Sequence, residues 1–176
     1  LNAKVTYELL AKHIPAEDWH FMNYGYIPNA DEKPMVLKEQ PVQLYPLQMY
    51  HYLAAMKPLE GKLVLEVGSG RGGGARHISQ FYKPAFYTGL DLAQHAVDLA
   101  NKIHVFPNLK FIQGSAESIP LADNSVDVVI NVESSHAYGR VDKFLIEVRR
   151  VLQLGGYLLL VAFRSGHSMS NFLQQL

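Results

Sequence analysis

The sequence predicts an α/β fold built on a doubly wound, mostly parallel sheet. From about Lys62 onward, short runs of apolar and β-branched residues alternate with stretches in which apolar residues recur at helical spacing. The short runs are continuously apolar rather than alternately polar, which is typical of strands buried on both faces. Right-handed crossovers between such strands place helices on both faces of a single sheet.

Five strands are expected in this region, with helices between them. The strands are expected at 62–67, 85–90, 109–113, 125–131 and 157–163. The helices are expected at 72–82, 93–103 and 141–152. The last helix has apolar residues spaced along one face, and Gly155 and Gly156 are expected to end it.

The first 60 residues have a different pattern. Helices are expected at 5–13 and 41–56, on either side of an irregular segment. Six of the ten tyrosines and the only tryptophan lie in this part of the chain. We therefore expect a helical lid segment at 1–60 and a core domain at 61–176.

Composition excludes several classes of protein. The 176 residues are 48% hydrophobic, enough for one large core, and the absence of cysteine excludes disulfide scaffolds and thiolate chemistry. Lys and Arg total 16 and Asp and Glu total 16, a balance that argues against nucleic acid as the main partner. The longest uncharged apolar run, 157–163, is far shorter than the roughly 20 residues of a membrane-spanning helix. No signal peptide is visible, and a cytoplasmic location is expected.

A glycine-rich turn follows the first expected strand. Gly68, Gly70 and Gly73 form a Gly-x-Gly-x-x-Gly pattern directly before an expected helix. Glycine lets a ligand approach the backbone closely, and the amino end of a helix favours a carboxylate or a phosphate. A tight turn without a ligand is the alternative for this pattern alone.

An acidic residue, Asp91, ends the second expected strand, 21 residues after Gly70. A carboxylate there can accept hydrogen bonds from two ribose hydroxyls, although it can also cap the following helix. The turn and Asp91 alone would also fit an NAD(P)-dependent oxidoreductase. Glu66 argues against that class, because dinucleotide folds usually have an apolar residue there. A ligand with an ammonium and a sulfonium group tolerates an acid at that point.

Five short motifs occur in order, one in each β–α unit. They are Glu66-x-Gly68-x-Gly70-x-Gly72, Gly89-Leu90-Asp91-Leu92, Gly114-Ser115-Ala116-Glu117-x-Ile119-Pro120, Asp127-Val128-Val129 and Leu152-x-x-Gly155-Gly156. Over about 63–163 the chain therefore resembles the class I S-adenosylmethionine (SAM)-dependent methyltransferases, whose core is Rossmann-like. The stretches at 131–136 and 21–26 are most similar to small-molecule and lipid O-methyltransferases of the phthiotriol dimycocerosate and fatty-acid type.

The resemblance implies a binding site for SAM. Its residues would be Glu66, Gly68, Ser69, Gly70, Asp91, Leu92, Ser115, Ala116, Glu117 and Asn131. Glu66 and the carbonyl of Asn131 would lie near the ammonium group of SAM. Asp91 would hold the ribose, and the N–H of Ala116 would meet the adenine edge. Ser115 replaces the family's usual acid, so weaker adenine recognition is expected.

Methyl transfer from a sulfonium is an in-line displacement, to which a protein contributes mainly alignment and the exclusion of water. A base helps an oxygen acceptor, and His136 is the candidate because it follows the fourth strand on the ligand-binding edge. The alternatives for His136 are a structural role or acceptor contact without proton transfer. Glu133 would orient His136 or recognise the acceptor.

No metal site is expected, since Glu133 and His136 could form a pair of ligands but no third ligand is evident. Tyr24 and Tyr26 are expected to face the cleft and to contact the acceptor with His136.

The sequence thus predicts a SAM-dependent methyltransferase that acts on a small or lipid-like apolar acceptor, with oxygen favoured over carbon or nitrogen. The alternatives are an NAD(P)-dependent oxidoreductase and a SAM-binding module without activity. The family's core normally continues into a helix and a final β-hairpin. The 13 residues after Phe163 can hold that helix, at 168–176, but not the hairpin. We therefore expect a core whose terminal hairpin is missing.

Overall fold

The computed structural model describes residues 20–29, 31 and 43–163. The helices expected at 5–13 and 168–176 lie outside the described residues. No described helix is both long enough and apolar enough to cross a bilayer. The elements are α2 (Leu44–Ala55), β1 (Leu63–Val67), α3 (Gly73–Phe81), β2 (Phe86–Asp91), α4 (Gln94–Ile103), β3 (Leu109–Gln113), β4 (Val126–Val132), the 3-10 helix η2 (Ser135–Ala137), α5 (Val141–Val151) and β5 (Leu152–Val161).

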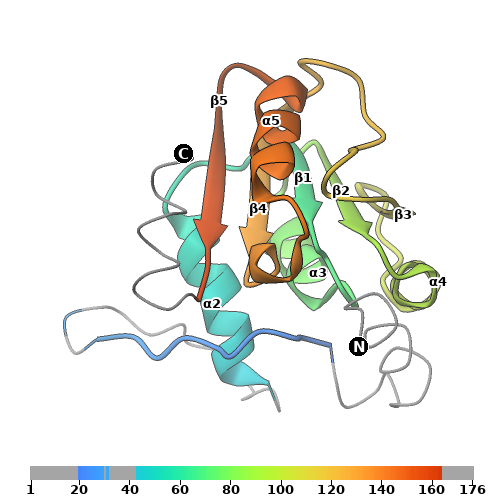
Figure 1. The fold of residues 1–176 in the computed structure, drawn as a ribbon. Coiled ribbons are helices and arrows are strands. Elements are labelled where there is room, and N and C mark those ends of the chain that lie inside the picture. Colours follow the sequence, from blue (N-terminus) through green and yellow to red (C-terminus); the bar gives the residue numbers. More distant parts are fainter. Residues whose placement is uncertain (1–19, 30, 32–42, 164–176) are drawn as a thin grey trace.

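The strands form a five-stranded sheet in the order β3-β2-β1-β4-β5, and every neighbouring pair is parallel (Figure 1). At its centre, Glu66 of β1 lies opposite Gly89 of β2 and Ile130 of β4. The doubly wound, parallel α/β fold predicted from the sequence is confirmed. The chain moves from β1 toward one edge of the sheet and from β4 toward the other. The carboxyl ends of β1 and β4 therefore flank a topological switch point.

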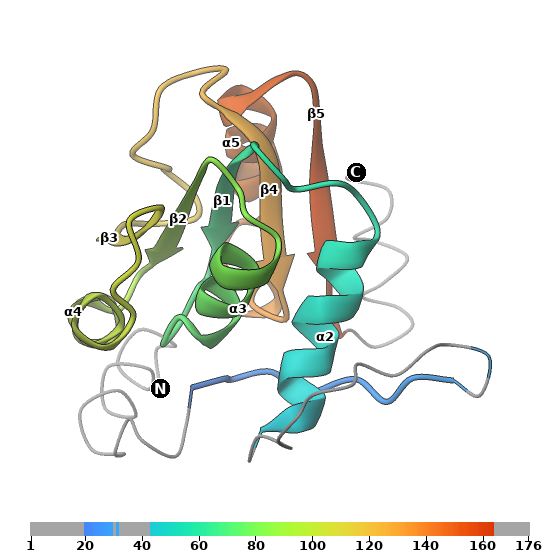
Figure 2. The ribbon, with the colours of Figure 1, turned by 180° about the vertical axis from the view of Figure 1, so that it is seen from behind.

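Helices cover both faces of the sheet. One core cluster joins α2, α3 and α4 to one face, through residues such as Leu53, Ile78 and Val97. A second cluster joins α5 to the opposite face, through Phe144 and Val148. In Figure 1 α5 lies in front of the sheet, and in Figure 2 α2 and α3 do. Helix α2, which belongs to the expected lid segment, thus packs in the same core as α3.

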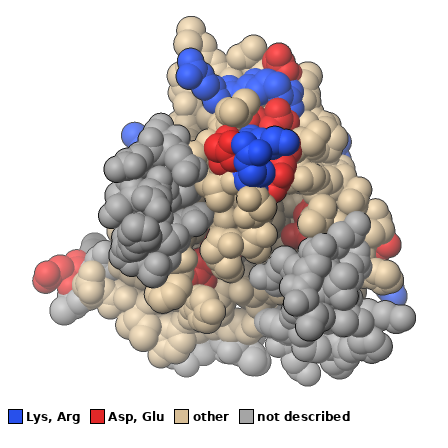
Figure 3. All heavy atoms as spheres, in the orientation of Figure 1, with Lys and Arg blue, Asp and Glu red and all other residues tan. Residues whose placement is uncertain are grey.

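The connection between β3 and β4 contains no helix, and Arg150 of α5 holds it in place. Arg150 Nη2 donates to Ile119 O and Arg150 Nη1 donates to Leu121 O, both at 2.8 Å. The same guanidinium forms ion pairs with Asp123 and Glu147. Figure 3 shows acidic and basic side chains interspersed over α5 on this face. These contacts of Arg150 hold the β3–β4 loop, which forms one wall of the pocket described below.

Strand β5 begins earlier than the sequence indicates. Helix α5 ends at Val151 and β5 follows at once, so Gly155 and Gly156 lie within the strand rather than at the end of a helix. Regular pairing with β4 begins at Tyr157, and the residues before it form an irregularity in the register. The apolar run that predicted the strand therefore coincides with its regularly paired part.

Candidate functional site

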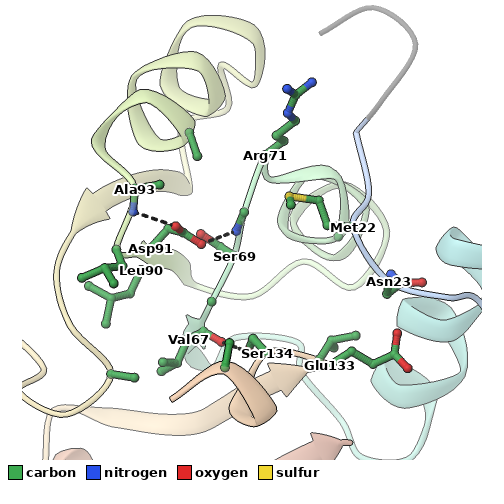
Figure 4. Close-up of a pocket in the computed structure, with 18 of the residues that line it drawn as sticks. Met22, Asn23, Val67, Ser69, Arg71, Leu90, Asp91, Ala93, Glu133 and Ser134 are labelled. Carbon is green, nitrogen blue, oxygen red and sulfur yellow. Dashed lines mark hydrogen bonds between the residues drawn. The ribbon is translucent and has the colours of Figure 1, made fainter. Parts of the chain in front are cut away.

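A pocket of about 300 Å³ opens at the carboxyl ends of β1 and β4. Its walls come from the turns after β1, β2 and β4, from the β3–β4 loop and from residues 20–23. Ligands of open α/β sheets bind at this place, where the strand order reverses. Figure 4 shows how the side chains of these segments surround the cavity.

The turn after β1 requires glycine at position 68. Gly68 has a φ of +79°, and a Cβ there would lie 2.4 Å from Ser134 Oγ. The backbone N–H groups of Gly68 and Ser69 both donate to Leu90 O, at 2.8 and 3.0 Å. The turn is therefore tied to the end of β2, and Gly68, Ser69 and Gly70 all line the pocket.

The carboxylate of Asp91 lies in the pocket wall and is held by two backbone amides. Asp91 Oδ2 accepts a hydrogen bond from Gly70 N–H at 2.7 Å, and Oδ1 accepts one from Ala93 N–H at 2.9 Å (Figure 4). Ala93 is the N-cap residue of α4. Asp91 thus supports the start of α4 and the glycine turn while it faces the cavity. The two alternatives for this residue, contact with a ligand and support of the following helix, are therefore compatible with each other.

The loop after β3 forms the opposite wall, where Ser115, Ala116 and Glu117 line the pocket, and Leu92, directly after β2, lines it too. Ser115 Oγ accepts a hydrogen bond from Glu117 N–H at 3.1 Å. Glu117 Oε1 accepts one from the N–H of Arg140 at 2.9 Å. The structure therefore brings all the predicted cofactor residues together around one cavity except Glu66 and Asn131, which lie behind its wall.

Glu66 is fully buried and does not line the pocket. Tyr50 OH donates to Glu66 Oε1 at 2.6 Å and Tyr87 OH donates to Oε2 at 3.0 Å. Burial raises the pKa of Glu66 to about 7, although the two hydroxyl donors oppose this shift. Tyr50 does line the pocket, so α2 contributes to the site through this ring.

A cluster of polar side chains lies behind the glycine turn. Asn131, also fully buried, donates from Nδ2 to Val67 O at 2.9 Å. Ser134 Oγ and Tyr138 OH approach the same carbonyl oxygen at 3.1 and 3.3 Å, and both residues line the pocket. Sequence reasoning missed Ser134 and Tyr138. Both lie in the short segment directly after β4, and this position at the ligand-binding edge of the sheet is the signal that could have suggested them.

Residues 20–24, here called the strap, cross one side of the pocket. His20 O accepts a hydrogen bond from Gly73 N–H at 3.2 Å, and Tyr24 N–H donates to Glu133 Oε2 at 2.6 Å. The strap residues that line the pocket are His20, Phe21, Met22 and Asn23. Figure 4 shows Met22 beside the glycine turn and Asn23 near Glu133. The stretch at 21–26 carries part of the family resemblance, but none of these four residues was predicted to line the site, because their contacts are with segments far away in the chain and leave no local pattern.

Of the residues predicted for catalysis and acceptor binding, only Glu133 lines the pocket. His136 is exposed on η2 and does not line it. Tyr24 is 82% exposed, and the Tyr26 ring stacks on Tyr52 with centroids 4.6 Å apart. Neither tyrosine lines the cavity. The roles of His136, Tyr24 and Tyr26 therefore stay predictions.

The charge of the pocket favours a cationic ligand over an anionic one. Among the described lining residues, Asp91, Glu117 and Glu133 supply three carboxylates, and Arg71 supplies the guanidinium. Burial lowers the pKa of Arg71. A pyrophosphate would meet an excess of like charge here, whereas an ammonium or sulfonium group would be stabilised. No cluster of metal-ligating side chains is found in the described part of the chain.

A family model described as a methyltransferase domain matches residues 65–160. Two curated relatives extend the similarity beyond this range. The chain is 42% identical to the fatty-acid O-methyltransferase of Mycolicibacterium smegmatis over 159 residues, which cover 89% of the chain and 57% of the relative. It is 38% identical to phthiotriol/phenolphthiotriol dimycocerosates methyltransferase 1 of Mycobacterium ulcerans, over 94% of the chain and 61% of the relative. The chain thus spans about three fifths of the length of these relatives.

Solved structures share the fold. The YcgJ protein from Bacillus subtilis is 29% identical, with a TM-score of 0.61 over 70% of the chain and 56% of that protein. The [4+2]-cyclase SpnF has a TM-score of 0.72 over 88% of the chain and 57% of that protein. Its identity is 22%, so the likeness to SpnF concerns the fold alone.

Proposed function

Because the chain belongs to the methyltransferase-domain family, we propose that it transfers a methyl group from SAM to a small, apolar acceptor, with oxygen as the favoured acceptor atom. The observation that carries this proposal is the pocket at the switch point. There, Asp91 is fixed to the glycine turn, and carboxylates outnumber the guanidinium. These residues fit a ligand that combines a ribose with a positive charge.

The chain's own residues would hold the cofactor along the pocket. Asp91 would accept hydrogen bonds from the ribose hydroxyls, in a position that two backbone amides already fix. Leu92, Ser115 and Ala116 would contact the adenine. Bound SAM supplies the methyl group and its own thioether leaving group.

The amino-acid end of SAM would lie near the glycine turn and the strap. Glu66 is separated from the pocket by Tyr50, so its influence on an ammonium group would pass through that ring and its hydroxyl. Asn131 would act in a similar way, by fixing Val67 O, Ser134 and Tyr138 behind the turn. Both residues then shape the site without touching the ligand through their side chains.

We keep His136 as the proposed base for the acceptor oxygen. It follows β4 at the ligand-binding edge, two residues after the pocket-lining Ser134. In-line displacement needs the acceptor oxygen aligned with the methyl group, and removal of its proton helps once it is aligned.

An apolar acceptor suits the surface beside Glu133. The exposed rings of Tyr24 and Phe163 contact each other there, with centroids 6.0 Å apart. Two relatives are named for fatty-acid and phthiotriol dimycocerosate methylation, which supports a lipid-like acceptor. We also propose that residues 1–60 act as the lid of a cofactor-binding core at 61–176.

Two experiments test the proposal. Calorimetric titration with SAM and with NAD separates the methyltransferase from an oxidoreductase: SAM should bind and NAD should not, and the reverse result would overturn the proposal. A transfer assay with methyl-labelled SAM, run against fatty acids, polyketide lipids and small phenols, then tests catalysis. SAM binding without transfer to any of these acceptors would favour a non-catalytic SAM-binding module.

A further inference from the structure

We propose that Glu133 is a positioning residue that latches the strap across the cofactor pocket and thereby slows the release of the cofactor. The inference rests on the proposed function only for the identity of the ligand. The latch itself is a contact between two parts of this chain, Glu133 after β4 and the backbone N–H of Tyr24.

One end of the strap is anchored by neutral backbone and amide groups. Gln43 Oε1 accepts hydrogen bonds from the N–H groups of His20 and Phe21, at 2.6 and 3.2 Å. Gly73 N–H donates to His20 O at 3.2 Å. These contacts attach the start of the strap to the beginning of α2 and to the first turn of α3.

The other end is held by a carboxylate. Tyr24 N–H donates to Glu133 Oε2 at 2.6 Å, a charge-assisted hydrogen bond that is stronger than one to a neutral acceptor. Beside it, Asn23 Oδ1 accepts from Gly25 N–H at 2.8 Å, and Asn23 Nδ2 donates to Pro46 O at 3.3 Å. This end of the strap is therefore attached to α2 by neutral groups and to Glu133 by a charged acceptor.

The backbone of Glu133 is unusual for a residue with a long side chain. Its φ is +46°, a left-handed conformation that residues other than glycine, asparagine and aspartate seldom adopt. Its N–H donates to Val161 O at 2.8 Å, which fixes the residue to β5. A strained conformation that persists beside a pocket indicates a functional demand on the side chain. Figure 4 shows that this side chain extends toward the strap near Asn23.

The latched strap covers the part of the pocket that binds the cofactor in our proposal. Met22 Sδ lies 3.4 Å from the position that a Cβ on Gly70 would take, so the strap contacts the glycine turn directly. A ligand seated on that turn lies beneath Met22 and Asn23. It can leave on this side only after the strap has moved, and that motion breaks the bond between Tyr24 and Glu133.

The test compares Glu133→Ala and Glu133→Gln with wild type, and Glu60→Ala serves as an exposed control. Dissociation of radiolabelled S-adenosylhomocysteine is followed by rapid filtration after dilution into an excess of unlabelled ligand. We expect Glu133→Ala to raise the dissociation rate about fivefold to tenfold. Glu133→Gln should raise it about twofold, because its amide oxygen still accepts the N–H. Glu60→Ala should leave the rate unchanged.

Amide hydrogen exchange of Tyr24 in the free protein provides a readout that does not need the ligand. Exchange at Tyr24 should be faster in Glu133→Ala and intermediate in Glu133→Gln. Unchanged exchange in both variants overturns the latch, whatever the ligand does. If wild type does not bind S-adenosylhomocysteine but Tyr24 exchange accelerates, the latch stands and the proposed cofactor fails. If the ligand binds and leaves all variants at the same rate, the latch does not control release.

Discussion

Asp91 serves two neighbours with one carboxylate. Its oxygens bind the N–H groups of Gly70 and Ala93, so the side chain connects the glycine turn with the start of α4. The same side chain faces the pocket. A ribose-binding role would therefore use a carboxylate whose position is set before any ligand arrives.

Replacing Asp91 by Ala should weaken SAM binding by about a hundredfold or more, because two hydrogen bonds to the ribose would be lost. Each lost hydrogen bond to a charged group contributes roughly 1.5–3 kcal/mol, and the glycine turn also loses its support. Calorimetry on the variant measures the loss. Asp98→Ala, on the exposed face of α4, is the matched control and should bind SAM as wild type does. An unchanged affinity in Asp91→Ala would remove this residue from the proposed site.

His136→Ala should lower the rate of methyl transfer by about 100-fold or more while SAM affinity stays within about twofold, as expected when a general base is lost. Steady-state kinetics with labelled SAM, together with calorimetry, separates the two quantities. Normal turnover would show that His136 is not the base. A joint loss of turnover and affinity would instead point to a structural role in η2.

Glu66 should make stability depend on pH. Folding raises its pKa to about 7 from the usual 4.5, so between these values the folded protein keeps a proton that the unfolded chain has lost. Its contribution to stability is therefore full below pH 4.5 and is lost as the pH rises through 7. Urea unfolding at pH 5 and pH 8 should show Glu66→Gln gaining up to about 3 kcal/mol relative to wild type at the higher pH. Glu60→Gln, an exposed control, should show no such gain, and parallel pH profiles of Glu66→Gln and wild type would contradict the expectation.

At the scale of elements, α2 and α3 pack against each other where the ring of Tyr50 lies on Gly74. A Cβ on Gly74 would lie 2.1 Å from Tyr50 Cε1, so the helices can approach this closely only without a side chain there. The hydroxyl of the same ring binds Glu66, which prevents the ring from moving aside freely.

Gly74→Ala should therefore destabilise the protein by about 1–3 kcal/mol through overpacking, although alanine is the better residue in a free helix. Urea unfolding measures the effect. In a Tyr50→Leu background the penalty should shrink, because the smaller side chain leaves space, and a double-mutant cycle reports the coupling. An additive double variant would mean that the ring and the glycine do not constrain each other.

Local sequence patterns predict elements well where burial is continuous. The runs at 85–90 and 125–131 have the apolar character of buried strands, and β2 and β4 occur there, buried over most of their length. The start of β5 was predicted less well, because Gly155 and Gly156 are as compatible with an irregularity inside a strand as with the end of a helix. Glycine indicates an unusual backbone conformation, but whether that conformation ends a helix or forms an irregularity in a strand depends on the neighbouring strand.

In the site, too, some features could be predicted from local sequence and others could not. Gly68 follows β1 and Asp91 ends β2, so topology alone brings them to one edge of the sheet. The burial of Glu66 behind Tyr50 and the bond from Tyr24 to Glu133 depend on packing between segments far apart in the chain. No local pattern contains that information, so the sequence placed Glu66 and Tyr24 nearer to the ligands than the structure does.

At the scale of the whole molecule, the pocket joins segments from the strap to η2 and beyond, so its occupation should stabilise the fold. S-adenosylhomocysteine at 100 times its Kd should add about 2.7 kcal/mol to the free energy of unfolding. Thermal unfolding with and without the ligand measures this as a rise in Tm. NAD at the same concentration should leave Tm unchanged. A rise with NAD alone would contradict the proposed cofactor.

The contact between Tyr24 and Glu133 joins positions 109 residues apart, which has a consequence for synthesis of the chain. A ribosome releases the strap long before it has made β4, and domains generally fold in the order in which they emerge. The strap therefore has no carboxylate to bind until most of the sheet exists. We expect the nascent pocket to stay open on this side until β4 and its glutamate emerge, so capture of the cofactor would follow translation of the strap by a fixed delay.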